Sequence, residues 1–401
     1  MVLQPVDPNE RFRLRRQEHR RRIRIRRAFL ASVLLVIGGV VALAANSLLG
    51  GRTGAPVSEH ASATGDTAKP PAAARPRATP KEIRGVHVTM ALLSIPGKLD
   101  EYLKLKRSGL NTLEVDVKDE NGEVGFVPSA VPLAQQIGAA KPYYRPREVA
   151  RKVHAAGIYL IGRVVTFEDP TLAEHRPDMA IHTSDGSIWH TNGGLGWANP
   201  YDRRVWDYDV SIAEAAVRAG FDEIQFDYVR FPSDGDLSII RYPGKHPQPM
   251  GWTIPAFVHY AARRLHPLGA RVSVDVFGLS ATQDLGIGQN PRRVARYVDA
   301  IYPMVYPSHY TPGEYNVADP NAYPGTIVAY SLRDFTRAVR GRRARLVPWL
   351  QDFSLGKTYT LSDVQDQVAS ARRAHTGGFM LWNATGVYTD GALAPASTSS
   401  P

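Results

Sequence analysis

The chain has 401 residues, 43% of them hydrophobic, which is enough for one large domain of about 250 residues or more together with extensions. It contains no cysteine, which excludes disulfides, thiolate metal sites, a cysteine nucleophile and lipidation on cysteine. The net charge of +11 is concentrated at the start: residues 1–27 hold ten arginines against three acidic residues, so the rest carries only +4. A body this weakly charged gives no reason to expect a nucleic-acid partner.

The N-terminal segments predict a membrane anchor. Residues 1–27 form an Arg-rich tail, and residues 28–49 form an apolar run long enough to span a bilayer. The arginines place the tail in the cytoplasm by the positive-inside rule, so everything after the span is expected outside the cytoplasm, on a single-pass membrane protein. The alternative is a signal peptide cleaved near Ala42–Ala44, which would secrete the protein.

Composition also marks the connecting segments. Residues 50–80 are rich in Gly, Ala, Pro, Ser and Thr, which predicts a disordered, flexible linker. Residues 390–401 form a second low-complexity tail, which is also predicted to be disordered. Between them, residues 81–389 are expected to fold as one domain.

Strand and helix patterns alternate through this domain. Eight strand-helix alternations predict a (β/α)₈ TIM barrel. The count of eight and the absence of a Gly-rich fingerprint after the first strand argue against the alternative, an open doubly wound sheet. No cofactor is predicted. The expected strands are residues 84–89, 111–118, 158–166, 221–227, 271–277, 300–306, 344–350 and 378–382, and the expected helices are 99–108, 147–156, 203–219, 255–268, 291–299, 331–340 and 361–374.

Alternation within the strands assigns many polar residues to the barrel interior. Outward-facing apolar residues leave the intervening side chains facing inward: His87, Thr89, Glu114, Asp116, Lys118, Glu223, Gln225, Asp227, Ser273 and Asp275. Buried charges are costly unless they pair, so Glu114 and Glu223 are expected to form a structural network with Lys118 or Arg163. In the seventh strand, either Gln351 or Asp352 faces inward.

Carboxylates near the C-terminal ends of barrel strands lie where barrel enzymes place their active sites. Glycoside hydrolysis needs one ionised carboxylate and one protonated carboxyl group. Asp227 is the candidate nucleophile or base, with Arg163 or Arg230 available to keep it charged. Asp275 is the candidate acid, and Asp352 could be the acid or a transition-state stabiliser instead.

Aromatic, amide and histidine side chains in the following loops suit the binding of a polysaccharide or oligosaccharide. An alternative for Trp197, as for Trp189, is packing within the long loop of residues 167–200. The candidate substrate-binding residues are His87, Asp116, Arg163, Glu168, Trp197, Arg230, Tyr306, His309, Trp382 and Asn383.

Two other functions remain open. Asp116, Asp227 and Asp275 could form an acidic Mg²⁺ site, although the lone His87 gives no sign of a His-x-His metal motif, and no metal site is predicted. A non-catalytic barrel that binds carbohydrate or organises the envelope would keep the same side chains without turnover. The sequence contains no Gly-x-Ser-x-Gly motif of a serine hydrolase.

The chain also resembles a known family. The segments RGVHVT, NTLEVDVKDENGEVGF, GIYLIGRVVTFEDP, WANPYDRRVWDY, FDEIQFDYVRFPSDG, DVFG and YPMVYPSHY are similar to the bacterial "putative glycoside hydrolase" domain family, and FDYVRFP is the most specific of them. The resemblance covers residues 83–389 and implies a TIM barrel near the α-amylase-like barrels. It implies Asp227 as nucleophile. The strand-five acid is usually Glu in amylase-like barrels, whereas this chain has Asp275.

Overall fold

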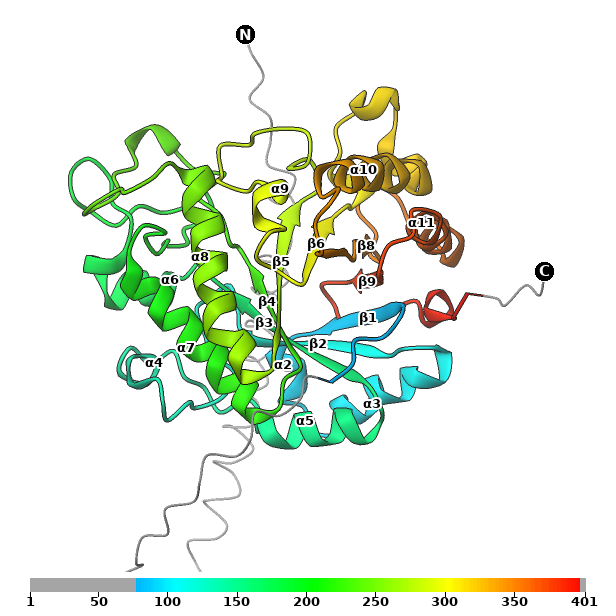
Figure 1. Cartoon of the computed structure of the whole chain (residues 1–401), viewed down its shortest axis with the longest axis horizontal. Helices are drawn as coiled ribbons and strands as arrows, with labels where there is room; N and C mark the ends of the chain where they lie inside the picture. The colour runs from blue at the N-terminus through cyan, green and yellow to red at the C-terminus, as the bar shows by residue number, and fades with distance from the viewer. Residues whose placement is uncertain (1–76, 397–401) are drawn as a thin grey trace, which may run out of the picture. The chain divides into compact units, whose positions relative to one another are not determined.

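The computed structural model describes residues 77–396. Its sheet contains only parallel pairings, in the order β5-β4-β3-β2-β1-β9-β8-β6-β7, and β5 also pairs with β6. That last pairing closes the sheet, which confirms the predicted (β/α)₈ barrel and excludes the open sheet (Figure 1). The strands are β1 (Ile83–Val88), β2 (Thr112–Lys118), β3 (Tyr159–Val165), β4 (Glu223–Asp227), β5 (Arg271–Phe277), β6 (Ala300–Met304), β7 (Arg345–Leu346), β8 (Trp349–Gln351) and β9 (Gly378–Trp382).

The seventh position of the barrel is divided between two short strands. Both β7 and β8 pair with β6, and β8 also pairs with β9. β7 and β8 together therefore occupy the position of one barrel strand. Pro348 lies between them, and proline has no N–H to donate to a neighbouring strand. The predicted strand 344–350 is therefore present but interrupted.

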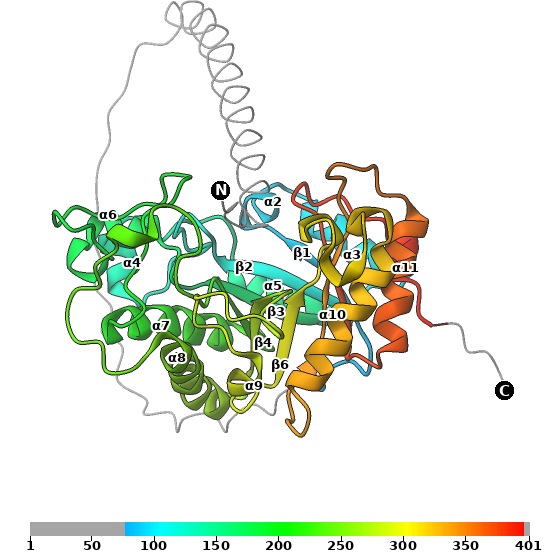
Figure 2. The same ribbon diagram turned by 90° about the horizontal axis from the view of Figure 1, so that it is seen from above.

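Helices lie outside the strands in both views (Figures 1 and 2). The predicted helix 203–219 is confirmed to the residue. It begins after Asp202, which caps its N-terminus, and ends at Gly220, which adopts the left-handed region at φ 112°. The main helices are α3 (Lys98–Lys104), α5 (Pro146–Ala155), α7 (Arg203–Ala219), α8 (Met250–Leu265), α9 (Pro291–Val294), α10 (Pro324–Ala338) and α11 (Leu361–Arg373). Short helices α2 (Met90–Leu93), α4 (Pro132–Gln136) and α6 (Pro170–His175) lie in the loops.

Three helices differ from their predicted extents by five residues or more. α8 begins at Met250 rather than at residue 255. α10 begins at Pro324 rather than at residue 331, because proline is well suited to the first helical position. α9 ends at Val294 rather than at residue 299, and the chain continues in tighter turns, in which Arg296 and Tyr297 donate to carbonyls three residues back.

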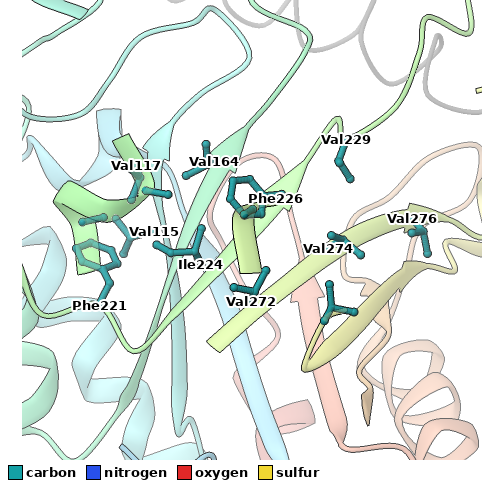
Figure 3. Packing of buried hydrophobic residues seen from close by; sticks show 14 of the residues in the cluster. Val115, Val117, Val164, Phe221, Ile224, Phe226, Val229, Val272, Val274 and Val276 are labelled. Atoms are coloured by element: carbon teal, nitrogen blue, oxygen red, sulfur yellow. The ribbon is translucent and has the colours of Figure 1, made fainter. Parts of the chain in front are cut away.

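The main hydrophobic core lies between the barrel and its helices. Figure 3 shows outward-facing side chains of four neighbouring strands packed together (Val115, Val117, Val164, Ile224, Phe226, Val272, Val274 and Val276). Phe226 meets Phe257 of α8 edge to face at 5.3 Å. Gly162 fits this layer because a Cβ there would lie within 2.9 Å of Phe221 and Val117. These residues have the outward orientation that the alternation predicts.

Lys118 contradicts its predicted inward orientation. The register between β2 and β3 shifts between Asp116 and Lys118, so strict alternation ends there. The Lys118 Nζ lies 2.6 Å from Asp209 of α7 and 2.6 Å from Asp169, which caps α6. Lys118 therefore anchors the helices beside the barrel and takes no part in the interior network.

The interior network below the site is also built differently from the prediction. Glu223 is buried and accepts hydrogen bonds from the hydroxyls of Tyr159 and Tyr302, each at 3.0 Å. Its expected structural role is confirmed, but its partners are tyrosines rather than Lys118 or Arg163. These hydroxyls satisfy the carboxyl group at a depth where water does not reach.

Several predicted segments lie outside the described residues. They are the tail 1–27, the membrane span 28–49 and most of the linker 50–80. Within residues 77–396, no helix combines the length and the apolar character that crossing a membrane requires. At the other end, the chain continues past Thr389 into a short 3₁₀ turn, Asp390–Leu393, whose Leu393 is fully buried.

Candidate active site

The candidate site lies at the C-terminal ends of β2, β3, β4 and β5. Strand register aligns Asp116 with Arg163, and Arg163 with Gln225. Gln225 is in turn aligned with Ser273, so the next inward-facing row places Asp227 beside Asp275. Neighbouring strands are about 4.8 Å apart, which brings the two carboxyl groups into one site. This is the end of a TIM barrel at which catalytic groups are found.

Arg163 links the acidic residues of the site. Its Nη1 donates to Asp116 Oδ1 at 2.7 Å, while its Nη2 and Nε donate to Asp227 Oδ2 at 2.7 and 3.0 Å. Glu120 lies within 3.5 Å of the same guanidinium. Arg163 is buried, whereas the Asp227 side chain is 13% exposed. Of the two predicted partners of Asp227, Arg163 forms the ion pair, and an ionised Asp227 is the natural partner of a permanently charged guanidinium.

The backbone turns sharply just after Asp227. Tyr228 adopts φ 51°, a left-handed conformation that is unfavourable for a bulky residue. Its N–H donates to Asp227 Oδ1 at 2.7 Å, so this turn fixes the second carboxylate oxygen. The turn in segment 226–232 therefore has a structural role. It orients the Asp227 side chain toward the C-terminal end of the barrel and then directs the backbone out of the strand.

Asp275 has a different environment from Asp227. It is buried, and its Oδ1 accepts hydrogen bonds from Gln225 Nε2 and Trp349 Nε1, each at 2.6 Å. Burial, together with the charge of Asp227, raises the pKa of Asp275 well above its ordinary value. Because both donors meet Oδ1, Oδ2 is the oxygen that can carry a proton. The site therefore combines a buried carboxyl group whose pKa is raised with a neighbouring carboxyl group that is ion-paired with Arg163.

His87 connects the interior to the site. Its Nδ1 lies 2.6 Å from Glu114 Oε2, and its Nε2 lies 3.6 Å from Asp116 Oδ1. Burial, followed by the charge of Asp275, raises the pKa of Glu114 well above its ordinary value. The expected structural role of Glu114 is thus supported by His87, not by Lys118. The His87 ring also lies 4.7 Å from the ring of Trp382.

Aromatic side chains line the same end of the barrel. Trp382 ends β9 and lies 5.8 Å from the Arg163 guanidinium. Tyr306 and His309 meet edge to face at 5.2 Å, and Phe353 lies 5.7 Å from Tyr306. Burial, followed by the charges of Asp275 and Asp227, raises the pKa of Tyr306 well above its ordinary value, so its hydroxyl remains protonated beside the two carboxyl groups. Tyr306, His309 and Trp382 therefore lie at the same end of the barrel as the two carboxyl groups, and their contact with a substrate stays a prediction.

Other predicted site residues have structural partners instead. Both oxygens of Asp352 accept hydrogen bonds from Thr389, at 2.6 and 2.7 Å, and this fastens the last loop to the barrel. Burial raises the pKa of Asp352, but no contact within residues 77–396 joins it to Asp227 or Asp275. Asn383 uses its side chain to bond the Asp352 carbonyl and Thr385.

Trp197 corrects a further expectation. It is fully buried, and its ring lies 5.0 Å from the Arg230 guanidinium. Arg230 also lies close to the rings of Tyr228 and Phe277, and donates to Ser233 at 3.0 Å. Trp197 therefore packs the long loop, as its alternative interpretation predicts, and offers no face to a sugar. Glu168 is buried at the start of the β3–α6 connection.

Sequence reasoning missed two parts of the site. Glu120 approaches Arg163 from a loop, where no periodicity predicts orientation. Trp349 reaches Asp275 from β8, two positions around the barrel, so the contact depends on closure of the sheet. The one feature of the sequence that could have indicated this contact is a tryptophan directly after Pro348, in a short buried strand.

The arrangement of the carboxylates does not favour the predicted alternative of a Mg²⁺ site. Arg163 supplies a positive charge between Asp116 and Asp227, the position that a cation would take. Across residues 77–396, no group of three or more His, Asp or Glu side chains has the arrangement of a metal site. The donor set around these carboxylates is therefore that of an ion-pair network.

Removing the guanidinium should destabilise the fold. We expect Arg163→Ala to cost about 3–5 kcal/mol of unfolding free energy, because two buried carboxylates lose their partner. The matched control is Arg204→Ala, which breaks exposed ion pairs with Asp178 and Asp202 and should cost about 1 kcal/mol or less. Urea denaturation measures both, and equal losses would contradict the central role of Arg163.

Comparison with known proteins places the fold in context. A family model described as "Putative glycosyl hydrolase domain" matches residues 85–388. The PgaB (BpsB) glycoside hydrolase domain from Bordetella bronchiseptica aligns with 76% of this chain and 94% of its own, at 13% identity and a TM-score of 0.53, a similarity of fold.

Two further solved structures align less closely. A hypothetical protein from Ruminiclostridium thermocellum ATCC 27405 is 36% identical over 48% of this chain and 97% of its own, with a TM-score of 0.43. The catalytic domain of β-amylase from Paenibacillus polymyxa covers 79% of this chain and 96% of its own, at 13% identity and a TM-score of 0.49. A search of curated proteins finds no match.

Proposed function

Because the chain belongs to the "Putative glycosyl hydrolase domain" family, we propose that it hydrolyses O-glycosidic bonds with Asp227 and Asp275 as the reacting pair. The observation that carries the proposal is the contrast between the two groups. Asp227 is ion-paired with Arg163, whereas burial and the charge of Asp227 raise the pKa of Asp275. One ionised and one protonated carboxyl group, side by side, are what glycoside hydrolysis requires.

In this mechanism Asp275 donates its proton to the glycosidic oxygen as the bond to the anomeric carbon breaks. Asp227 supplies the electron pair at the opposite face, either by attacking the anomeric carbon or by taking a proton from the attacking water. Both routes need the same ionised carboxylate, and Arg163 and the Tyr228 N–H hold it in place. Trp382, Tyr306 and His309 would bind the sugar ring.

The substrate that fits the chain's organisation is a polysaccharide of the cell envelope or of the extracellular space. The arginines of residues 1–27 and the apolar run 28–49 support a cytoplasmic N-terminus and an extracytoplasmic barrel. Protease added to intact spheroplasts should then degrade the barrel and spare a cytoplasmic marker protein. Protection of the barrel until the cells are lysed would contradict this location.

A panel of purified envelope and extracellular polysaccharides tests the proposed activity. The full chain should release new reducing ends from at least one polymer, and EDTA should leave the rate unchanged. A loss of activity with EDTA, restored by Mg²⁺, would instead favour the metal-dependent alternative. Binding of one polymer without any cleavage would favour the non-catalytic carbohydrate-binding barrel.

Trp349 is expected to set the pH range of the reaction. Its N–H bond to Asp275 favours the charged carboxylate, so Trp349→Phe should raise the pKa of Asp275 further. The alkaline limb of the kcat/KM profile should therefore move to higher pH while the acidic limb stays in place. Trp252→Phe, a change to an exposed tryptophan, is the matched control. An unchanged alkaline limb would show that Trp349 fills space in the barrel without affecting the pKa of Asp275.

A further inference from the structure

The end of the barrel opposite the candidate site is strongly basic. The connection from α10 to β7, residues 337–345, holds five arginines and no acidic residue, and residues 104–111 hold three cations and no acidic residue. We call this end the base. It comprises the segments 77–84, 104–111, 263–271, 295–299, 337–345 and 372–377, which together hold 17 lysines and arginines against two acidic residues. Two further acidic residues border these segments: Asp222 of the α7–β4 connection, which pairs with His154, and Asp390, which contacts Ser108.

Side-chain and backbone hydrogen bonds join these segments into one surface. Arg345 Nη2 donates to the carbonyls of Pro80 and Gly377, at 3.1 and 2.8 Å. Arg84 Nε donates to the Gly109 carbonyl at 2.8 Å. The Arg345 N–H donates to the Asp299 carbonyl at 2.9 Å. Asp299 in turn contacts His266 and Arg271 of segment 263–271, so all six segments are in direct contact.

The two acidic residues of the base are already paired within it. Glu82 contacts Arg84 and Arg372, at 2.9 and 2.7 Å. Asp299 contacts His266 at 2.9 Å and Arg271 at 3.7 Å. The excess positive charge is consequently available to a partner, and several of its side chains are exposed to solvent, namely Arg107, Arg263, Arg296, Arg340 and Arg343.

We propose that the base binds the anionic headgroups of a membrane surface. The cations are spread over a ring of connections at one end of a barrel, which suits a broad charged surface better than a single chain of polymer. The described chain also begins on this surface, at residue 77, directly before β1.

Chain length brings a membrane within reach of the base. The composition of residues 50–80 predicts a flexible linker, and a linker of that length spans about 30 Å on average. Residues 28–49 are the predicted anchor at its far end. Docking of the base would direct the candidate active site away from the lipid, toward polymer substrates. The proposal concerns orientation and stands independently of the reaction.

Single fluorophores can test this geometry, because the chain has no native cysteine. Thr336→Cys labels an exposed position beside the base, and Ser184→Cys labels an exposed loop at the opposite end as a matched control. The full chain is reconstituted in phosphatidylglycerol–phosphatidylcholine vesicles that contain a headgroup-labelled energy acceptor. Energy transfer should be stronger from position 336, and it should fall in pure phosphatidylcholine and in about 0.5 M salt.

Charge removal makes the test specific. Arg296→Gln, Arg340→Gln and Arg343→Gln together should lower the ratio of docked to undocked protein about 100-fold, at about fivefold for each cation. The control, Arg147→Gln, Arg241→Gln and Arg292→Gln, removes equal charge outside the base and should leave transfer unchanged.

Three results would overturn the proposal. They are equal transfer from both labelled positions, unchanged transfer from position 336 in the triple base variant, and binding of soluble polygalacturonate to the base without lipid contact. The last would assign the surface to an anionic polysaccharide. Hydrolysis of soluble oligosaccharides should be the same in both triple variants, so failure of this proposal and failure of the proposed reaction are distinguishable.

Discussion

Asp275→Asn is expected to lower kcat on a natural polysaccharide by about 10²–10⁴-fold, because the leaving oxygen would depart without a proton. The amide keeps the shape of the carboxyl group and can still accept the hydrogen bonds of Gln225 and Trp349. A substrate with an activated leaving group distinguishes the loss of the acid from a general loss of folded protein. Dinitrophenolate leaves without protonation, so the variant should cleave a dinitrophenyl glycoside of the same sugar at nearly the wild-type rate.

Equal losses on the two substrates would contradict the acid role of Asp275. The pH profile gives a second reading of the same variant. In the wild type, activity should fall as pH rises through the raised pKa of Asp275, because the acid is then ionised. With the activated substrate, Asp275→Asn should lack this alkaline limb.

The raised pKa of Asp275 also has a consequence for stability. The folded protein binds this proton more tightly than the unfolded chain, in which an aspartate has a pKa of about 3.9. Its stabilising contribution is therefore complete below the unfolded pKa and is lost as pH rises through the folded one. Asp275→Asn should remove part of the wild-type loss of Tm on the alkaline side. The rest of the loss of Tm should persist in this variant, because the pKa of Glu114 is also raised.

Asp227→Asn is the second change with a large expected effect. It removes the ionised oxygen that attacks the anomeric carbon or activates water, so hydrolysis should fall on the order of 10³-fold or more on natural and activated substrates alike. Glycan binding should persist, because the aromatic residues and Arg163 remain. Loss on both substrates distinguishes this variant from Asp275→Asn.

Asp352→Asn is the matched control for Asp227→Asn. It changes another buried carboxyl group at the same end of the barrel, one that Thr389 occupies through both oxygens. We expect a lower Tm and near-normal kcat on the protein that remains folded. Loss of catalysis in Asp352→Asn, with activity retained in Asp227→Asn, would reverse the assignment of the ionised group.

The barrel was predictable because local signals repeat along the chain. Strands 271–277 and 378–382 are confirmed to the residue, since valines and aromatic residues alternate or cluster between clear turn residues. Helix 203–219 is bounded by a capping aspartate and a glycine. These signals need no knowledge of distant contacts.

Predictions failed where the backbone departs from strict alternation. A register shift after Asp116 turns Lys118 outward toward Asp209, and one extra residue is enough to reverse the face. Pro348 divides the seventh strand, so the sequence could not decide between Gln351 and Asp352. No single-residue pattern marks such irregularities.

The candidate site was predictable only in part, for a related reason. Strand position was enough to select Asp227 and Asp275, but their different environments come from other strands. Arg163 on β3 pairs with the first, whereas Trp349 on β8 donates to the second. Which carboxyl group is buried, and which is ion-paired, depends on how the barrel closes.

A crystal structure of Asp227→Asn with a bound oligosaccharide substrate would show whether residues 227 and 275 flank a glycosidic bond. We expect a glycosidic oxygen within about 2.6–3.2 Å of Asp275 Oδ2. We also expect the anomeric carbon to face the side chain at position 227, with a sugar ring against Trp382 or Tyr306. An oligosaccharide whose glycosidic bonds all lie beyond reach of both positions would contradict the assignment of Asp227 and Asp275 as the reacting pair.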